Sequence, residues 1–237
     1  MPGFKKSYDF ANGEVLLFNK DLEWTSFDLV SRVRNTLYKI TGIKKLKVGH
    51  AGTLDPLATG LLILCTGKAT KRIEIYQAEE KEYVATIKLG ATTPSFDLET
   101  EEDSQNDCSF ITEEIFKSAV KKFVGEIEQV PPVFSAVKVN GKRAFDYARK
   151  GETLELKPRK IVIRNIELIS FQLPTAEIKV VCSKGTYIRS LARDIGEELK
   201  CGAYLTGLKR TRIGEYKVEN AMTVAGFIEN LNRFETN

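Results

Sequence analysis

Apolar residues recur at helical spacing in three segments of the chain, residues 26–42, 111–125 and 186–202. Residues three and four positions apart lie on one face of a helix, so each segment predicts a helix that buries one side. The apolar stripes are Leu29, Val30, Val33, Leu37 and Ile40, then Ile115, Ala119, Val120 and Phe123, then Ile188, Leu191, Ala192, Ile195 and Leu199. Thr25 or Ser26 can cap the first helix and Gly42 can end it.

Runs rich in β-branched and aromatic residues alternate with these helices and predict strands. They lie at residues 14–20, 61–67, 82–90, 134–139, 161–173, 177–183 and 203–218. Asn140-Gly141 is typical of a tight hairpin turn. Strands outnumber helices, and several connections are too short for a helical crossover. The pattern therefore predicts an α+β fold in which helices flank a mostly antiparallel or mixed central sheet.

Composition limits the class of protein. A chain of 237 residues with 42% hydrophobic residues can fill a real core, and we expect one catalytic domain over residues 1–237. Charges and a glycine interrupt the first residues, and no apolar run approaches the ~20 residues that span a bilayer. We therefore expect a cytoplasmic protein with no membrane partner. The four cysteines are far apart and form no C-x-x-C pair, which argues against a disulfide framework or a structural zinc site.

Charge is distributed unevenly along the chain. Residues 97–114 carry eight acidic residues and no basic one, and we expect the run at 97–109 to form an exposed loop. The rest of the chain has 36 basic and 24 acidic residues, a net charge of +12. Short basic clusters such as KKLK and KPRK border glycine-rich turns. A single cluster can be an ordinary solvated face, but several together favour a nucleic-acid partner.

The segment VGHAGTLDPLATG, residues 48–60, contains the only histidine of the chain. Asp55 precedes a proline, and such an aspartate is usually a structural turn residue. Its neighbourhood supports a second reading, because Gly52 and Gly60 allow close approach of a ligand and nearby leucines can surround one carboxylate. A partly desolvated carboxylate with one positive partner suits a nucleophile or a base.

His50 lacks the partners that most histidine chemistry needs. No second histidine or nearby cysteine completes a metal site, and no G-x-S-x-G or P-loop pattern is present. His50 is then either a ring that stacks or wedges against a base, or a structural histidine. In CSKGTYIRSLARDIG, Tyr187 and Arg189 open a predicted helix. Arg189 could hold a carboxylate ionised and Tyr187 could face a base, although an ordinary helix start has the same pattern.

Together these stretches resemble the TruB family of tRNA pseudouridine-55 synthases over nearly the whole chain. The stretches that carry the resemblance follow the family order: VLLFNKDLEWTSFD, KVGHAGTLDPLATGLL, KEYVATIKLG, QVPPVFSAVKVNGKRAFDYARKGE, CSKGTYIRSLARDIG and CGAYLTGLKRTRIG. The resemblance implies the pseudouridine synthase fold. It also implies that Asp55 is the essential aspartate and Arg189 its ion-pair partner. Tyr83 would be the aromatic ring beneath the target base and a candidate for proton removal at C5.

The same resemblance implies how the RNA is bound. Tyr187 and Leu208 would line the base pocket, Lys20 would be the lysine of the N-terminal strand, and His50 would occupy space vacated in the RNA stack. The segment 131–151 opens on two prolines and is rich in basic and aromatic residues. It would be an arm that inserts into the T-stem-loop.

The activity implied is isomerisation of uridine 55 in the T-loop of tRNA, by base flipping and an aspartate-dependent exchange of a C–N for a C–C glycosidic bond. No cofactor or metal is expected, because the isomerisation is redox-neutral. We expect a monomer without an obligate protein partner. The alternatives are a non-catalytic RNA-binding protein or tRNA-folding chaperone of the same fold, and a guide-RNA-dependent synthase of eukaryotic type, which would need a further C-terminal domain.

Two departures from the family pattern stand out. The segment TTPSFDLET keeps Asp97 but has proline and serine where aspartate and threonine are expected, which puts an RNA contact from this segment in doubt. The chain also ends soon after AMTVAGFIENL, so we expect no C-terminal RNA-binding PUA domain.

Overall fold

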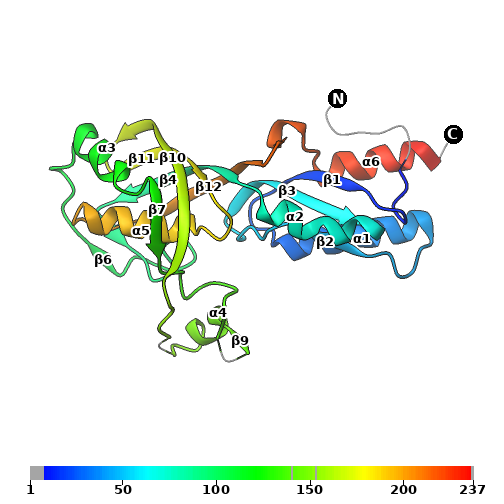
Figure 1. The fold of residues 1–237 in the computed structure, drawn as a ribbon, viewed down its shortest axis with the longest axis horizontal. Coiled ribbons are helices and arrows are strands. Elements are labelled where there is room, and N and C mark those ends of the chain that lie inside the picture. The colour runs from blue at the N-terminus through cyan, green and yellow to red at the C-terminus, as the bar shows by residue number, and fades with distance from the viewer. Residues whose placement is uncertain (1–7, 140, 153, 236–237) are drawn as a thin grey trace. The chain divides into compact units, whose positions relative to one another are not determined.

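The computed structural model describes residues 8–139, 141–152 and 154–235. The chain forms two compact units, Met1–Tyr83 with Lys209–Asn237 and Val84–Leu208 (Figure 1). Two strands, β4 (Lys81–Leu89) and β12 (Ala203–Ile213), run from one unit into the other. No helix in the described part of the chain is long and apolar enough to cross a membrane. The single catalytic domain expected over residues 1–237 stays a prediction.

The first unit is built around strand β3, with which β1, β2 and β12 all pair. Its elements are β1 (Val15–Lys20), α1 (Ser26–Thr41), β2 (Val48–His50), β3 (Ala58–Thr66), the 3-10 helix Gly67–Arg72, α2 (Ile73–Ala78), β13 (Tyr216–Lys217), the 3-10 helix Val218–Asn220 and α6 (Val224–Glu235). Strands β1 and β2 both pair antiparallel with β3, in a register that sets Phe18 opposite Leu62 and His50 opposite Leu64. The hairpin of β2 and β3 therefore carries the segment 48–60.

Helix α1 begins and ends where the sequence predicts. Thr25 accepts a hydrogen bond from the Asp28 backbone and Asp28 returns one to the Thr25 backbone, which forms a capping box. Gly42 ends the helix with φ at 69°, a left-handed conformation that glycine adopts without strain. The predicted apolar stripe faces the core, since Leu29, Val33 and Leu37 are all at most 1% exposed.

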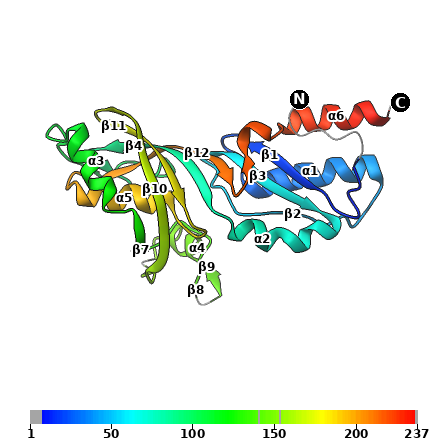
Figure 2. The same cartoon turned by 45° about the horizontal axis from the view of Figure 1, so that its top comes forward.

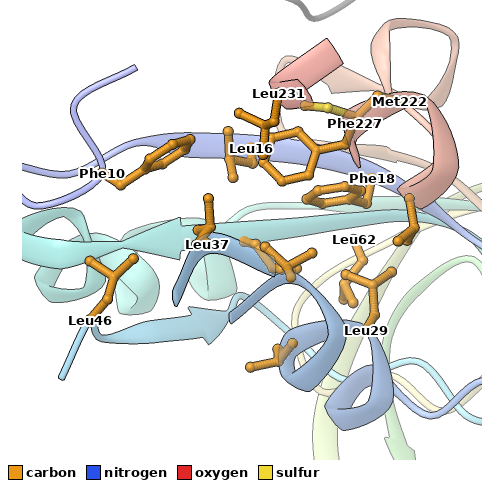
Figure 3. Packing of buried hydrophobic residues seen from close by; sticks show 14 residues of the cluster. Phe10, Leu16, Phe18, Leu29, Leu37, Leu46, Leu62, Met222, Phe227 and Leu231 are labelled. Atoms are coloured by element: carbon orange, nitrogen blue, oxygen red, sulfur yellow. The ribbon is translucent and has the colours of Figure 1, made fainter. Parts of the chain in front are cut away.

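Strand β3 is covered on both faces. On one face Leu62 and Leu64 join a cluster with β1, α1 and α6, in which Phe18 meets Phe227 edge to face at 5.3 Å between ring centroids (Figure 3). On the other face Leu61, Ile63 and Cys65 pack against the 3-10 helix and α2; the other buried members of that cluster are Ala51, Ala69, Tyr76, Ile213 and Val218. Burial on both faces explains why residues 61–65 of β3 are all apolar rather than alternating.

The second unit is a sheet with the strand order β12-β4-β11-β10-β7. Its other elements are β5 (Ala91–Thr92), β6 (Ser104–Gln105), α3 (Glu113–Lys121), β7 (Gly125–Gln129), β10 (Arg159–Gln172), β11 (Thr175–Cys182) and α5 (Ile188–Glu198). Strand β10 pairs antiparallel with both β7 and β11. The predicted α+β fold with helices flanking a mostly antiparallel or mixed sheet is confirmed.

The segment between β7 and β10 contains β8 (Lys138–Val139), β9 (Lys142–Arg143) and α4 (Ala144–Ala148). Figure 2 shows these elements grouped beside the ends of β7 and β10. Val137, Ala144 and Leu156 form a small buried cluster of their own here. Val139 pairs with Lys142 across the predicted hairpin turn, while Asn140 itself lies outside the described residues. The strand predicted over 134–139 is wrong in extent, because only its last two residues pair.

Two further expectations need correction. In α3 the buried stripe includes Phe116 at 0% exposed, whereas Ile115, predicted to be buried, is 43% exposed. The acidic run at 97–109 is not exposed throughout, since Asp97 is 6% exposed. The sequence patterns also missed α2, α4 and α6, and two of these are no longer than six residues. A short helix contains too few turns for a periodic stripe to be detected.

Candidate active site

Asp55 lies in the connection between β2 and β3. The Ala58 N–H donates to the Asp55 carbonyl at 3.0 Å, which closes a tight turn over Pro56 and Leu57. Proline fixes φ at the second position of this turn, as the Asp-Pro pair predicts. The Asp55 side chain is half-buried. A carboxylate is thus held in a short loop between two paired strands.

Ser26, at the start of α1, ties down the residue just before the aspartate. Its hydroxyl accepts a hydrogen bond from the Leu54 N–H at 2.8 Å and contacts the Leu54 carbonyl at 3.1 Å. Ser26 and Leu54 are both at most 3% exposed. Because the capping box fixes the first turn of α1, this contact fixes the backbone of the loop.

Lys20 supports the loop from β1. Its side chain is fully buried, and Nζ donates to the carbonyls of Asp21 at 2.9 Å, Trp24 at 2.5 Å and Pro56 at 3.4 Å. Burial lowers the pKa of Lys20 to about 8, while the negative charge of Asp55 opposes that change. The predicted residues Lys20 and Asp55 are thus close enough to interact electrostatically.

Arg210 on β12 is a second buried cation beside the same loop, and no local pattern distinguishes it from its basic neighbours. It is 1% exposed and donates to the carbonyls of Leu61 at 2.8 Å, Gly52 at 3.0 Å and Thr53 at 3.3 Å. Arg210 stands between Lys209 and Arg212 in the basic stretch LKRTR, which is typical of an exposed surface, so only the fold reveals that this arginine is buried. A weak sequence signal is Gly60, whose missing side chain lets the Arg210 backbone come close.

His50 ends β2, next to the loop, and is partly buried. Burial, and then the positive charge of Arg210, lower the pKa of its imidazole. The lowered pKa favours the neutral ring, which suits a stacking or wedging role. Tyr83 is 9% exposed on β4, where burial alternates along the strand, and Leu208 is half-buried on β12. Their predicted roles beside the base stay predictions.

In the second unit, Arg189 on α5 is 4% exposed and surrounded by acceptors. Its Nη2 donates to the Phe134 carbonyl at 2.8 Å and Nη1 to the Ser95 carbonyl at 3.3 Å, while Nε lies 3.5 Å from Oδ2 of Asp97. The segment TTPSFDLET thus turns inward at Ser95 and Asp97, and both contact Arg189. The predicted ion pair of Arg189 with Asp55 joins residues of different units and stays a prediction.

Tyr187 precedes α5 and is fixed by a residue that the sequence did not indicate. The Gln129 side chain accepts from the Tyr187 N–H at 2.8 Å and donates to the Tyr187 carbonyl at 3.1 Å. Ser190, one residue after Arg189, donates to the Val130 carbonyl at 2.8 Å. Tyr187 also packs against the cluster of the segment between β7 and β10. The start of that segment and the start of α5 therefore form one bonded assembly.

Two family descriptions match the chain, from residue 38 to residue 236. Residues 38–188 match the family described as "TruB family pseudouridylate synthase (N terminal domain)". Residues 189–236 match a second description, "tRNA pseudouridylate synthase B C-terminal domain". Together these matches include the Asp55 loop, Tyr83, the segment between β7 and β10, and α5.

Curated relatives match along nearly the whole chain. The chain is 60% identical over 221 residues to "tRNA pseudouridine synthase B" of Bacteroides fragilis, with 93% of this chain and 95% of the relative covered. It is 58% identical over 227 residues to the protein of the same name from Phocaeicola vulgatus, covering 96% and 97%. The relative from Flavobacterium johnsoniae, also of that name, is 50% identical over 224 residues, covering 94% and 98%.

Solved structures share the fold. The chain is similar to one in "Crystal Structure of a Cbf5-Nop10-Gar1 Complex", with a TM-score of 0.70 and 29% identity over 93% of this chain. A second, "Structure of H/ACA RNP bound to a substrate RNA containing 2'-deoxyuridine", has a TM-score of 0.67 and 26% identity over 93% of this chain. This chain spans about half of those two chains, 54% and 53%. With its family matches and its full-length relatives, the chain belongs to the TruB family of tRNA pseudouridine synthases.

Proposed function

We propose that this protein isomerises uridine 55 in the T-loop of tRNA to pseudouridine, and that Asp55 is the residue that acts on the ribose. The observation that carries the proposal is the way the loop is held. Ser26 fixes Leu54, and Lys20 reaches the carbonyl of Pro56, so the residues on both sides of Asp55 are bonded to the first unit. A fixed carboxylate suits a reaction that demands an exact approach to one carbon atom.

The chemistry breaks the N1–C1′ bond of uridine and forms a C5–C1′ bond. The C5 proton is lost and N1 regains a proton, so atoms and electrons balance without a cofactor. Asp55 either attacks C1′ or removes a proton from C2′. In this proposal Tyr83 lies beneath the base and is a candidate for proton removal at C5. Arg189 would keep the Asp55 carboxylate ionised through an ion pair.

The target uridine must leave its stack before these groups can reach it, at a cost of a few kcal/mol. In this proposal Tyr187 and Leu208 line the pocket that receives the base, and His50 fills the space vacated in the stack. A neutral, partly buried imidazole suits that role, since no charge has to be desolvated. The segment 131–151 contacts the T-stem-loop.

We propose that the protein acts on tRNA as a monomer in the cytoplasm, without an obligate protein partner. The net charge of +12 outside residues 97–114 supports a polyanionic substrate. Light scattering of the purified protein, alone and with a T-arm transcript, tests the oligomeric state and the stoichiometry together. Activity found only in a dimeric form would contradict the proposal that the protein acts as a monomer.

The decisive test compares Asp55→Asn with His50→Ala and the wild type. Pseudouridine is mapped in a tRNA transcript after incubation with each protein, and binding is measured separately. We expect Asp55→Asn to lower kcat by about 10⁴-fold or more with tRNA binding retained. His50→Ala should lose about tenfold, because one stacking contact is removed.

Turnover by Asp55→Asn at the wild-type rate would exclude Asp55 as the acting group. Binding of tRNA by the wild type without any pseudouridine would instead favour the non-catalytic RNA-binding protein. Pseudouridine at another position of the tRNA would retain the reaction and correct the site.

A further inference from the structure

We propose that Arg210 is a positioning residue for the reaction, because its guanidinium holds the backbone of the loop that carries Asp55. The inference rests on the proposed function, since the placement of the loop matters for turnover only if Asp55 acts on the ribose. Arg210 does not belong to the predicted site residues, and its role concerns the backbone on which those residues stand.

The guanidinium joins the two sides of the β2–β3 connection. Nη2 and Nη1 donate to the carbonyls of Gly52 and Thr53, which precede Asp55, and Nε donates to the carbonyl of Leu61, which follows it. A planar fork of fixed donors can hold several acceptors in one geometry, which the single ammonium of lysine cannot. Arg210 therefore fixes the width of the connection at its base.

Lys20 completes the support nearer the tip. Its Nζ lies 3.4 Å from the Pro56 carbonyl, and the Glu23 N–H donates to the same carbonyl at 2.9 Å. Carbonyls on both sides of Asp55 are thus bonded to donors from outside the loop. The residues between them have little backbone freedom, and a reacting carboxylate keeps its position without substrate.

The packing is shaped so that Arg210 reaches the loop. Gly60 has φ at 103°, and a Cβ at this position would lie 2.3 Å from the Arg210 carbonyl oxygen. Only a glycine allows β12 to approach β3 this closely. Every hydrogen bond that Arg210 donates within the described chain ends on a backbone carbonyl. Keeping a cation buried without a carboxylate is costly, so an apolar residue would serve better if packing were its only role.

The charge of Arg210 is also detectable by its neighbours. It contributes to the lowered pKa values of both His50 and Lys20, although burial is the larger cause in each case. His50 is the only histidine of the chain, so its ring protons give one unambiguous NMR titration. The NMR titration of His50, which belongs to the predicted site, therefore reports on the charge at Arg210, which does not.

The experiment compares Arg210→Lys and Arg210→Met with Arg212→Met in the full-length protein. Arg212 lies two residues further along β12 and is also bonded, to Glu80 at 2.9 Å and to the Gly214 carbonyl at 2.9 Å, away from the loop. It matches Arg210 in residue type and strand, and controls for the loss of a bonded arginine. The kinetics use a tRNA transcript, and the folded fraction of each variant is measured by circular dichroism.

We expect Arg210→Met to lower kcat per folded molecule by about 100-fold, the effect of a displacement of about 1 Å, with KM for tRNA within about threefold of the wild type. Arg210→Lys should fall between this variant and the wild type, because it keeps the charge but loses the fork. The His50 pKa should rise in Arg210→Met and stay near the wild-type value in Arg210→Lys. Arg212→Met should leave kcat unchanged.

An unchanged kcat in folded Arg210→Met would overturn the proposal, as would an equal loss in Arg212→Met. If Arg210→Met does not fold, Arg210→Lys decides, because full activity in that variant excludes a need for the fork. An inactive wild type would remove the proposed function and the inference with it. If the wild type forms pseudouridine and the folded Arg210 variants do so at the same rate, the proposed function stands and only the inference fails.

Discussion

The ammonium group of Lys20 is fully buried, yet its bonded partners in the described chain are three backbone carbonyls. Burial holds its pKa at about 8 in the folded protein, against 10.5 for an ordinary lysine. Between these pH values the folded protein binds fewer protons than the unfolded chain. The contribution of Lys20 to the free energy of unfolding therefore rises with pH across this window.

Activity should change in the opposite direction. As pH rises through about 8, Lys20 loses the charge that faces Asp55, and we expect kcat/KM to fall. Lys20→Arg keeps a charge at all these pH values, so its rate should hold above pH 8. Its stability relative to the wild type should decline over the same range. A pH–rate profile measures the change in kcat/KM, and denaturant unfolding at each pH measures the change in stability. If kcat/KM falls above pH 8 by the same amount in both proteins, the fall is not due to Lys20.

How far the sequence predicts single residues depends on whether a side chain acts locally. Asp55 could be singled out because its glycine and leucine neighbours lie beside it in the chain. Arg210 could not, because its acceptors lie about 150 residues away, and only the fold brings them together. Gln129, and the contact of Ser26 with Leu54, were missed for the same reason. The contact of Arg189 with Asp97 also depends on a loop whose inward turn no local pattern predicts.

At the scale of elements, the start of α5 and the end of β7 are joined through one side chain. Gln129 is 2% exposed, and both of its polar atoms bond the Tyr187 backbone. Ser190 and Arg189 add bonds to the carbonyls of Val130 and Phe134. The start of the segment that we propose to contact RNA is therefore hydrogen-bonded to the start of the helix that carries Arg189.

Gln129→Glu tests this connection. A carboxylate keeps the shape of the side chain but cannot donate to the Tyr187 carbonyl. We expect a loss of about 1–3 kcal/mol in the free energy of unfolding, the cost of a buried acceptor without its donor. We also expect weaker tRNA binding, because the start of the segment loses its anchor. Gln172→Glu, at the exposed end of β10, is the control in denaturant unfolding and filter binding.

Elements were predicted best where their pattern is long. Helix α1, with a capping box at one end and a glycine at the other, was predicted to within a residue. Strands β3 and β10 were also found, because their runs of apolar and β-branched residues are longer than a turn. In α3 the stripe was shifted, because Ile115 and Phe116 are both apolar and only packing decides which of them faces the core. The short elements between β7 and β10 depend on contacts with their own small cluster, which no periodicity reveals.

At the scale of the whole molecule, charge should govern the encounter with RNA. A net charge of +12 outside the acidic segment predicts binding that is largely electrostatic and that weakens as salt competes for phosphates. We expect the affinity for a T-arm transcript to fall at least about tenfold between 50 and 200 mM salt. Titrations at several salt concentrations measure the slope, with Asp55→Asn used so that the RNA is not modified. A flat slope would mean that the basic residues do not contact the backbone.

Because β3 is covered on both faces, its backbone amides should exchange slowly with solvent. Its amides cannot meet water unless the core of the first unit opens, so those of Leu62 and Leu64 should be among the last to exchange with deuterium. The loop that carries Asp55 ends where this slow strand begins. Between one tRNA and the next, the backbone on either side of Asp55 should therefore stay folded, so the loop does not have to form again for each substrate.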